Sequence, residues 1–225
     1  FFTMCCHSAL LAALRRPRGW AQLAPRRGAA TVQGQDLAEN FMVYEAPSRL
    51  GVMDPGTIRP LGRLEQRGVV HREGLWHRAI HLWVVLGDGR VLLQQRSQHK
   101  DTNPGRWDVS VAGHVSGHNT PEETAIQEAQ EEIGLTLAPS DLQRLFTMAR
   151  SETGKTSHGP FECNEILEVY TARCSAGLED LRTDPSEVAQ ILSIEQAQLM
   201  ARITQPDFVA IEEAYLEAIR PWFGP

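Results

Sequence analysis

A short strand, a glycine-containing loop and an acidic helix follow one another between residues 107 and 134. Thr120-Pro121-Glu122-Glu123 is a capping box with proline at the first helical position, so it predicts the start of a helix. Gly134 is a typical helix stop, and the helix is expected to run to about Ile133. A change from strand period to helix period within one short segment indicates an α/β protein.

The flanking segments predict further strands and helices. His77–Leu86 is rich in β-branched and aromatic residues and stops at the turn signal Gly87-Asp88-Gly89, so Val91–Arg96 is its expected hairpin partner. The remaining predictions are short strands or a hairpin over 41–49 and 57–70, strands over 107–111, 142–151 and 164–171, and helices over 193–202 and 207–219.

Composition and charge disfavour several classes of protein. The 225 residues suffice for one domain with extensions, and 42% hydrophobic content allows a proper core. No apolar run approaches the roughly 20 residues that a membrane span needs. Residues 36–225 carry 17 basic and 28 acidic side chains, a formal charge of −11 that does not attract nucleic acid. Such a body is compatible with an enzyme that gathers cations and meets phosphates through them.

Residues 1–35 are interpreted as a targeting segment, and residues 36–225 as the folded domain. The first segment holds five arginines and no acid, and its basic residues follow the apolar stretch Ala9–Leu14. Secretory signals have the reverse order, so a mitochondrial or chloroplast transit peptide is favoured. The alternative is a disordered tail without an address on a cytoplasmic protein.

The four cysteines form no recognisable framework. Cys5 and Cys6 lie in the leader, Cys163 and Cys174 are isolated, and no CxxC spacing occurs. We therefore expect reduced structural thiols in a reducing compartment rather than disulfides or zinc ligands.

Glu128, Glu131 and Glu132 are candidates for metal binding. At about 100° per residue, positions three and four apart share one helix face, so the three carboxylates point the same way. Their repulsion costs helix stability, which a hard cation bound by their oxygens would offset. In the preceding loop, Gly113 permits close approach of the backbone and offers its carbonyl as a ligand. The alternative is an ordinary solvated acidic face.

The surrounding residues favour the metal site over that alternative. Gly113…Glu128-Ala129-x-Glu131-Glu132-x-Gly134-Leu135 resembles the Nudix box, G-x5-E-x7-R-E-U-x-E-E-x-G-U, where U is a bulky apolar residue. Two positions depart from the pattern, with Asn119 in place of its first glutamate and Gln127 in place of its arginine. Arginine braces the glutamates by charge and glutamine only by hydrogen bonding, which puts rate or metal affinity in doubt. Glu123 is near enough to replace the missing acid in part.

The resemblance extends over nearly the whole body. His71–Ala79, the segment LLQQRS with Lys100, and Pro104–His114 look like the Nudix branch close to isopentenyl-diphosphate isomerases. Those isomerases carry an essential protonating cysteine where Ala112 stands here, and alanine has no transferable proton. The Glu131-Glu132 pair of the hydrolases is intact. We therefore expect a hydrolase rather than an isomerase, with a catalytically weak diphosphate-binding module as a third alternative.

The resemblance implies a mechanism and a set of ligands. Water activated by Mg²⁺ or Mn²⁺ would attack a phosphorus of the diphosphate. Glu128, Glu131 and Glu132 would hold the metal with help from the Gly113 carbonyl. The fold it implies is the α/β/α Nudix sandwich with a mixed sheet, and the partner is a small-molecule diphosphate, weakly favoured to be of the isoprenoid or thiamine type.

Residues outside the metal ligands also receive roles from the resemblance. The general base is open among Glu128 and Glu131 on the helix and Glu165 and Glu187 elsewhere, and each of the last two is otherwise a surface acid. The substrate-binding candidates are Arg96, Lys100 and His114. In isomerase fashion, His77, His81 and His114 could also be metal ligands, although a lone histidine in a strand is more often packed.

Overall fold

The structure is a computed structural model that describes residues 38–156 and 159–223. The expected targeting segment, residues 1–35, lies outside the described residues. The described residues belong to one compact unit. Among the described helices, none is both long and apolar enough to cross a membrane.

A two-stranded sheet and a short helix precede the main body. Strand β1 (Asn40–Tyr44) pairs antiparallel with β3 (Pro60–Gln66), and a single 3-10 turn (Pro55–Thr57) lies between them. The expected strand over 57–70 is wrong at its end, because residues 67–73 form helix α1 (Arg67–Glu73). Gly74 ends that helix with φ 60°, in the left-handed region that glycine adopts without strain.

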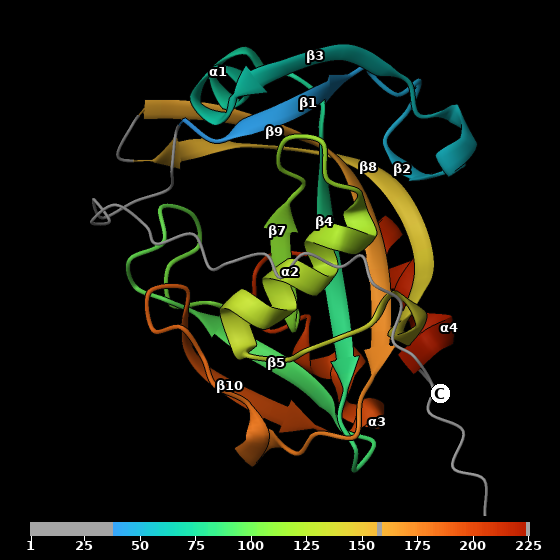
Figure 1. The fold of residues 1–225 in the computed structure, drawn as a ribbon, viewed down its shortest axis with the longest axis vertical. Coiled ribbons are helices and arrows are strands. Elements are labelled where there is room, and N and C mark those ends of the chain that lie inside the picture. The colour runs from blue at the N-terminus through green and yellow to red at the C-terminus, as the bar shows by residue number, and fades with distance from the viewer. Residues whose placement is uncertain (1–37, 157–158, 224–225) are drawn as a thin grey trace, which may run out of the picture. The chain divides into compact units, whose positions relative to one another are not determined.

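The main sheet is mixed and has eight strands. Its central path runs β10-β5-β4-β9-β8-β2, with β6 beside β5 and β7 beside β4. Figure 1 shows β4, β9 and β8 running side by side behind helix α2. The strands are β2 (Gly51–Met53), β4 (His77–Val85), β5 (Val91–Arg96), β6 (Trp107–Asp108), β7 (Val111–His114), β8 (Leu142–Thr156), β9 (Gly159–Arg173) and β10 (Val188–Ile194).

The expected antiparallel hairpin between β4 and β5 is present, but the two strands pair only next to the turn. The two strands share a single register pair, Val85 with Val91, next to the turn. Beyond it, β5 pairs antiparallel with β10, while β4 pairs in parallel with β9 from His77 to Val85. Away from the turn, the partners of both strands are thus distant in sequence, and no local turn signal can specify them.

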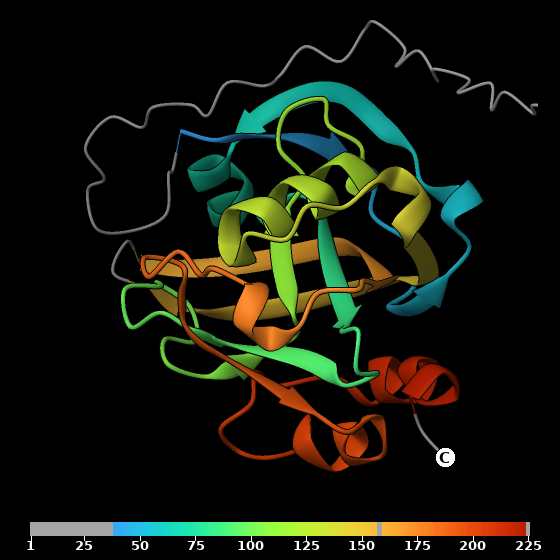
Figure 2. The same ribbon diagram turned by 60° about the horizontal axis from the view of Figure 1, so that its bottom comes forward.

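The helices cover the two faces of the sheet. Helix α2 (Pro121–Ile133) packs on one face, with Ala125 and Ala129 against Ile80, and helices α3 (Gln196–Arg202) and α4 (Glu213–Phe223) pack on the other. Figure 2 shows this layered arrangement, with α2 and the pair α3 and α4 on opposite sides of the strands. The α/β/α sandwich with a mixed sheet is confirmed.

Two predicted helices near the C-terminus begin later than expected. Residues 188–194 are strand β10, so the helix expected from Ser193 starts at Gln196. The helix expected from Asp207 starts at Glu213, because Phe208 forms a parallel β-bridge with Trp107. The Trp107 amide donates to Asp207 O at 2.9 Å, and the Val209 amide donates to Trp107 O at 2.8 Å. These strand-like bonds replace the helical ones.

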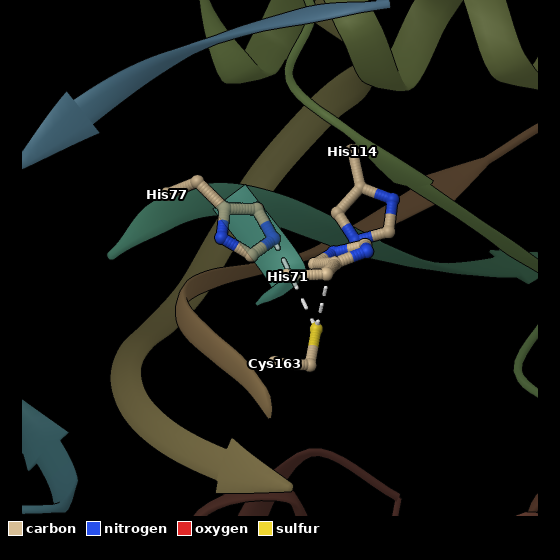
Figure 3. Close-up of side chains that lie close together, drawn as sticks. All are labelled: His71, His77, His114 and Cys163. Carbon is tan, nitrogen blue, oxygen red and sulfur yellow. Dashed lines mark hydrogen bonds between the residues drawn. The ribbon is translucent and has the colours of Figure 1, made fainter. Parts of the chain in front are cut away.

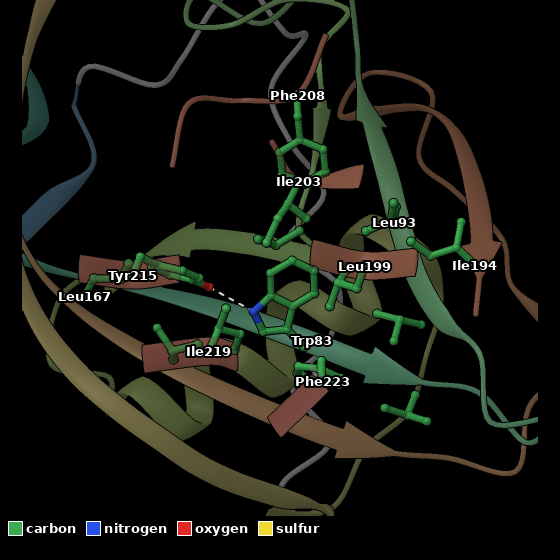
Figure 4. Packing of buried hydrophobic residues seen from close by; sticks show 14 of the residues in the cluster. Trp83, Leu93, Leu167, Ile194, Leu199, Ile203, Phe208, Tyr215, Ile219 and Phe223 are labelled. Atoms are coloured by element: carbon green, nitrogen blue, oxygen red, sulfur yellow. Dashed lines mark hydrogen bonds between the residues drawn. The ribbon is translucent and has the colours of Figure 1, made fainter. Parts of the chain in front are cut away.

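The core on the α3–α4 face surrounds a fully buried tryptophan. Trp83 donates from Nε1 to the Tyr215 hydroxyl at 2.9 Å, so its one polar atom is satisfied inside the core (Figure 4). This bond ties β4 to α4.

Candidate active site

The loop after β7 leads into α2 through the expected capping box. The Glu123 amide donates to Thr120 Oγ1 at 3.2 Å, and the Thr120 amide donates to Glu123 Oε2 at 2.8 Å. The Glu123 carboxylate is therefore engaged by the cap, which leaves little of it free to substitute for the acid missing at Asn119. The cap fixes the helix start and with it the direction in which the later glutamates project.

Glu128 lies directly against Gly113. A Cβ built on Gly113 would come within 2.4 Å of Glu128 Oε1, so any larger residue at this point of β7 would have to displace the Glu128 side chain. Burial, followed by the charges of Glu132 and Glu131, raises the pKa of Glu128 well above its usual value. The three acids of the helix therefore act on one another, as the predicted shared face requires.

Glu132 is the most buried acid of the helix. Its side chain accepts hydrogen bonds at Oε2 from Gln94 Nε2 at 3.1 Å and from the Ala112 amide at 3.4 Å. Burial raises the pKa of Glu132 to about 7, and the nearby Lys100 ammonium opposes that rise. Sequence reasoning missed Gln94, because its strand position gives no sign that it reaches the helix.

Glu131 is exposed, and the neutral side chain of Gln127 holds its carboxylate by a hydrogen bond. Gln127 Nε2 donates to Glu131 Oε1 at 2.9 Å. Asn119 Nδ2 in turn lies 3.4 Å from Gln127 Oε1, at the outer limit of a hydrogen bond. The two residues that depart from the Nudix box therefore contact each other, and the amide brace expected of Gln127 is present.

The residues present fit a hard divalent cation. One buried, one half-buried and one exposed carboxylate, together with a backbone segment without a side chain, form an oxygen donor set, the kind that Mg²⁺ and Mn²⁺ prefer. Without a cation, the buried like charges repel and their pKa values rise. A bound cation would remove that cost.

The predicted basic residues beside the helix are already paired. Arg96 Nη1 donates to Asp108 Oδ2 at 3.1 Å, and Arg96 Nε donates to Thr102 O at 3.1 Å. Lys100 forms an ion pair with Glu187. Burial lowers the pKa of Lys100, and the acids Glu132 and Glu128 counter this effect. Lys100, and with it Glu187, thus lies near the glutamates of helix α2. The Arg96 guanidinium is occupied by bonds to Asp108 and Thr102.

Glu165 and His114 lie on the opposite face of the sheet. Successive side chains of a strand alternate between faces, so His114 points away from the α2 side that Gly113 meets. Glu165 is paired with His77 across β9 and β4, and its side chain is buried rather than on the surface. Arg150 Nε donates to Glu165 Oε2 at 2.6 Å, and this guanidinium helps to hold the pKa of Glu165 well below its usual value against the effect of burial.

A group of metal-ligand residues lies on this second face, and sequence reasoning missed two of its members. We call it the histidine–cysteine cluster; it consists of His71, His77, His114 and Cys163. Figure 3 shows the four side chains pointing toward one another, with His77 from β4, His114 from β7 and Cys163 from β9. His81 is not a member, because its Nδ1 faces the Tyr215 hydroxyl at 3.2 Å. His71 and Cys163 carried no motif spacing that could have found them.

Comparisons with known proteins agree with this geometry. The family model of the NUDIX domain matches residues 75–213. Nudix hydrolase 3 of Arabidopsis thaliana is 40% identical over 110 residues, which are 48% of this chain but 14% of that protein. An isopentenyl-diphosphate Delta-isomerase of Dinoroseobacter shibae is 29% identical over 149 residues, covering 66% of this chain and 78% of that enzyme. A crystal structure from Deinococcus radiodurans covers 77% of this chain and 98% of its own, with 21% identity and a TM-score of 0.53.

A carboxylate-bearing helix packed on a glycine-containing strand within an α/β/α sandwich defines the class of Nudix-fold proteins. This chain belongs to the Nudix family, whose model matches more than half of it. The domain and its hydrolase relatives support an enzyme of the pyrophosphohydrolase type. Nudix hydrolases act on nucleoside diphosphate derivatives and generally use divalent metals such as Mg²⁺ or Mn²⁺.

Proposed function

We propose that this protein is a divalent-metal-dependent hydrolase that cleaves the diphosphate linkage of a small organic or nucleoside diphosphate derivative. The observation that carries the proposal is the packing of Glu128 against Gly113, next to the buried Glu132. A protein that needed only a stable helix would not place interacting acids against a strand. A bound cation would offset the repulsion between these acids and would bridge them to a diphosphate.

The chain's own residues orient the reaction. When bound, the divalent cation neutralises the diphosphate and lowers the pKa of the attacking water. Glu128, Glu131 and Glu132 hold that cation, and Gln94 and the Ala112 amide fix the Glu132 carboxylate. Of the four candidate bases, Glu128 is favoured, because it lies within the ligand group and directly against Gly113.

The isomerase alternative is disfavoured by the surroundings of Ala112. Ala112 pairs with His81 across β7 and β4, and burial lowers the pKa of His81 to about 4, so this histidine is neutral near pH 7. A neutral His81 hydrogen-bonded to Tyr215 is a poor substitute for a protonating thiol. The isomerase relatives nevertheless support a small organic diphosphate, of the isoprenoid or thiamine type, as a substrate worth testing.

The test is a substrate panel with the purified protein and Mg²⁺. We expect phosphate or pyrophosphate release from at least one diphosphate, and loss of that release in Glu132→Gln. Glu217→Gln is the matched control, because Glu217 is an exposed acid on α4, a helix of the other sheet face. Tight ligand binding without turnover under any metal would instead support the binding module. Conversion of isopentenyl to dimethylallyl diphosphate would overturn the hydrolase assignment.

A further inference from the structure

We propose that Glu168 and Tyr170 of β9 are positioning residues, which hold the first turn of α2 and thereby set the place of the metal-binding acids on that helix. The inference rests on the proposed function, because it concerns the site at which the divalent cation would act. Glu168 is only 1% exposed, and a carboxylate buried in the face of a sheet is costly unless it is paired. Its partners connect the sheet to α2.

Glu168 and Tyr170 lie on the α2 face of the sheet. Tyr170 belongs to the same buried cluster as Ala125 and Ala129, the small residues that α2 turns toward the strands. Side chains of a strand alternate between faces, so Glu168, two residues before Tyr170, points to the same side. Glu165 is an odd number of residues away and points to the other side. The buried acid of the α2 face is therefore separate from the histidine–cysteine cluster.

One hydroxyl links the buried acid to the helix. Tyr170 Oη lies 2.9 Å from Glu168 Oε2 and 3.0 Å from Glu122 Oε1. Burial and the charge of Glu122 raise the pKa of Tyr170, so the phenol keeps its proton. A phenol has a single proton, and the two carboxylates share it at one oxygen atom. Because Glu122 is the second residue of α2, this contact fastens the first turn of the helix to β9.

Two arginines offset the charge of the buried acid. Arg78 of β4 forms an ion pair with Glu168, and Arg144 Nη1 of β8 lies 3.6 Å from Glu168 Oε2. The Arg78 guanidinium also lies over the Tyr44 ring, 5.7 Å from its centre. Removal of any partner would leave a buried charge uncompensated, which favours a single arrangement of these side chains. Strands β4, β8 and β9 are thus joined at one carboxylate.

The same network holds the loop that precedes α2. The Val115 amide donates to Arg78 O at 2.9 Å, and Val115 directly follows β7. The loop is therefore fixed to β4 at its start, while the tyrosine contact fixes the helix turn at its end. Gly113 lies just before this segment and Glu128 lies beyond it. The network thus sets the distance between the two parts of the metal site, where an error of about 1 Å can be expensive for catalysis.

The test compares two variants that each lose one buried tyrosine hydroxyl. Tyr170→Phe removes the link to α2, whereas Tyr215→Phe removes the bond to Trp83 on the other face of the sheet. Mn²⁺ affinity is measured by electron paramagnetic resonance without substrate. It should weaken about tenfold in Tyr170→Phe, as for other residues that orient metal ligands, and stay unchanged in Tyr215→Phe. With a hydrolysed substrate, kcat/KM at low Mg²⁺ should fall in the same variant, and excess Mg²⁺ should restore part of it.

A double-mutant cycle shows whether the effect passes through Glu122. Glu122→Ala should weaken Mn²⁺ binding as Tyr170→Phe does, and the double variant should bind no more weakly, because both changes remove the same contact. Glu122→Gln keeps an acceptor for the phenol and should retain most of the parent affinity. Glu122 is only half-buried, so Glu122→Ala decides the outcome if Tyr170→Phe does not fold.

Failure of this inference differs from failure of the proposed hydrolase. If no diphosphate is hydrolysed but Tyr170→Phe weakens Mn²⁺ binding, the positioning role stands and the hydrolase assignment fails. Equal Mn²⁺ affinity in Tyr170→Phe and the parent, or an equal loss in Tyr215→Phe, would overturn the positioning role. A parent protein that binds no Mn²⁺ would overturn both.

Discussion

Gly113 and Glu128 meet so closely that a Cβ on the glycine would lie 2.4 Å from the glutamate oxygen. The backbone of Gly113 lies outside the left-handed region, so this glycine is required by space and not by its φ angle. A side chain at this position of β7 would therefore have to displace the Glu128 carboxylate of α2. The contact sets the place of one predicted metal ligand.

We expect Gly113→Ala to lower kcat/KM by about a hundredfold while the protein stays folded. The added methyl group must push Glu128 aside, and a displacement of about 1 Å in a catalytic site can cost that much. Steady-state kinetics with Mg²⁺ and urea unfolding of the same preparation measure the two effects. Full activity in Gly113→Ala would show that Glu128 is not held by this contact.

The contact between Asn119 and Gln127 predicts that the two positions are coupled. Gln127→Arg alone would give Glu131 a charge-assisted hydrogen bond. It would also remove the carbonyl oxygen that now faces the Asn119 amide group, so that two hydrogen-bond donors would face each other. Adding Asn119→Glu provides an acceptor for that arginine. We expect kcat to rise more in the double variant than the two single changes predict, by about 1 kcal/mol in a double-mutant cycle. Strict additivity would contradict the coupling.

The raised pKa of Glu132 predicts a stability cost in the metal-free protein. A carboxyl with a folded pKa of about 7 and an ordinary unfolded value binds more protons when folded, so stability falls as pH rises from the unfolded value through 7. Glu132→Gln should therefore raise the free energy of unfolding at pH 8 by up to about 3 kcal/mol. Urea unfolding at pH 8 and at pH 4.5 checks this, since the gain should disappear at the lower pH. Excess Mg²⁺ should also reduce the stability gain of Glu132→Gln at pH 8, because a bound cation would stabilise the charged carboxylate of the parent protein.

The lowered pKa of His81 predicts a loss of stability in acid. Burial and the Arg150 charge lower this pKa to about 4. Between pH 6.5 and 4, His81 is therefore protonated in the unfolded chain and neutral in the folded chain. The contribution of His81 is complete above its ordinary value of 6.5 and declines as pH falls toward 4. It amounts to about 3 kcal/mol over that window.

His81→Gln is the matched variant for the acid prediction, because glutamine keeps a partner for the Tyr215 hydroxyl and does not titrate. Urea unfolding free energies at pH 7 and pH 4.5 should differ less in this variant than in the parent. Asp108, Glu165, Arg96 and Arg150 also act on His81 and are unchanged in both proteins. Equal acid sensitivity of the two proteins would show that His81 does not titrate as described.

Local chemistry was enough to predict helix α2 and the acids on it. A capping box, a proline at the first helical position and a terminal glycine act within one or two turns, and the structure has each of them in place. The amide brace from Gln127 to Glu131 was also predictable, because residues four apart on a helix are neighbours. The family resemblance and the α/β/α fold followed from the same segment.

The tertiary structure alone decided which distant segments meet. The turn between β4 and β5 is in place and the two strands pair beside it, yet β5 pairs along its length with β10, because strand pairing depends on the burial of whole faces and not on the turn alone. Cys163 and His71 are 92 residues apart and carry no shared spacing. They come together only because α1, which carries His71, packs against β9, and such a contact between distant elements leaves no periodic trace along the chain.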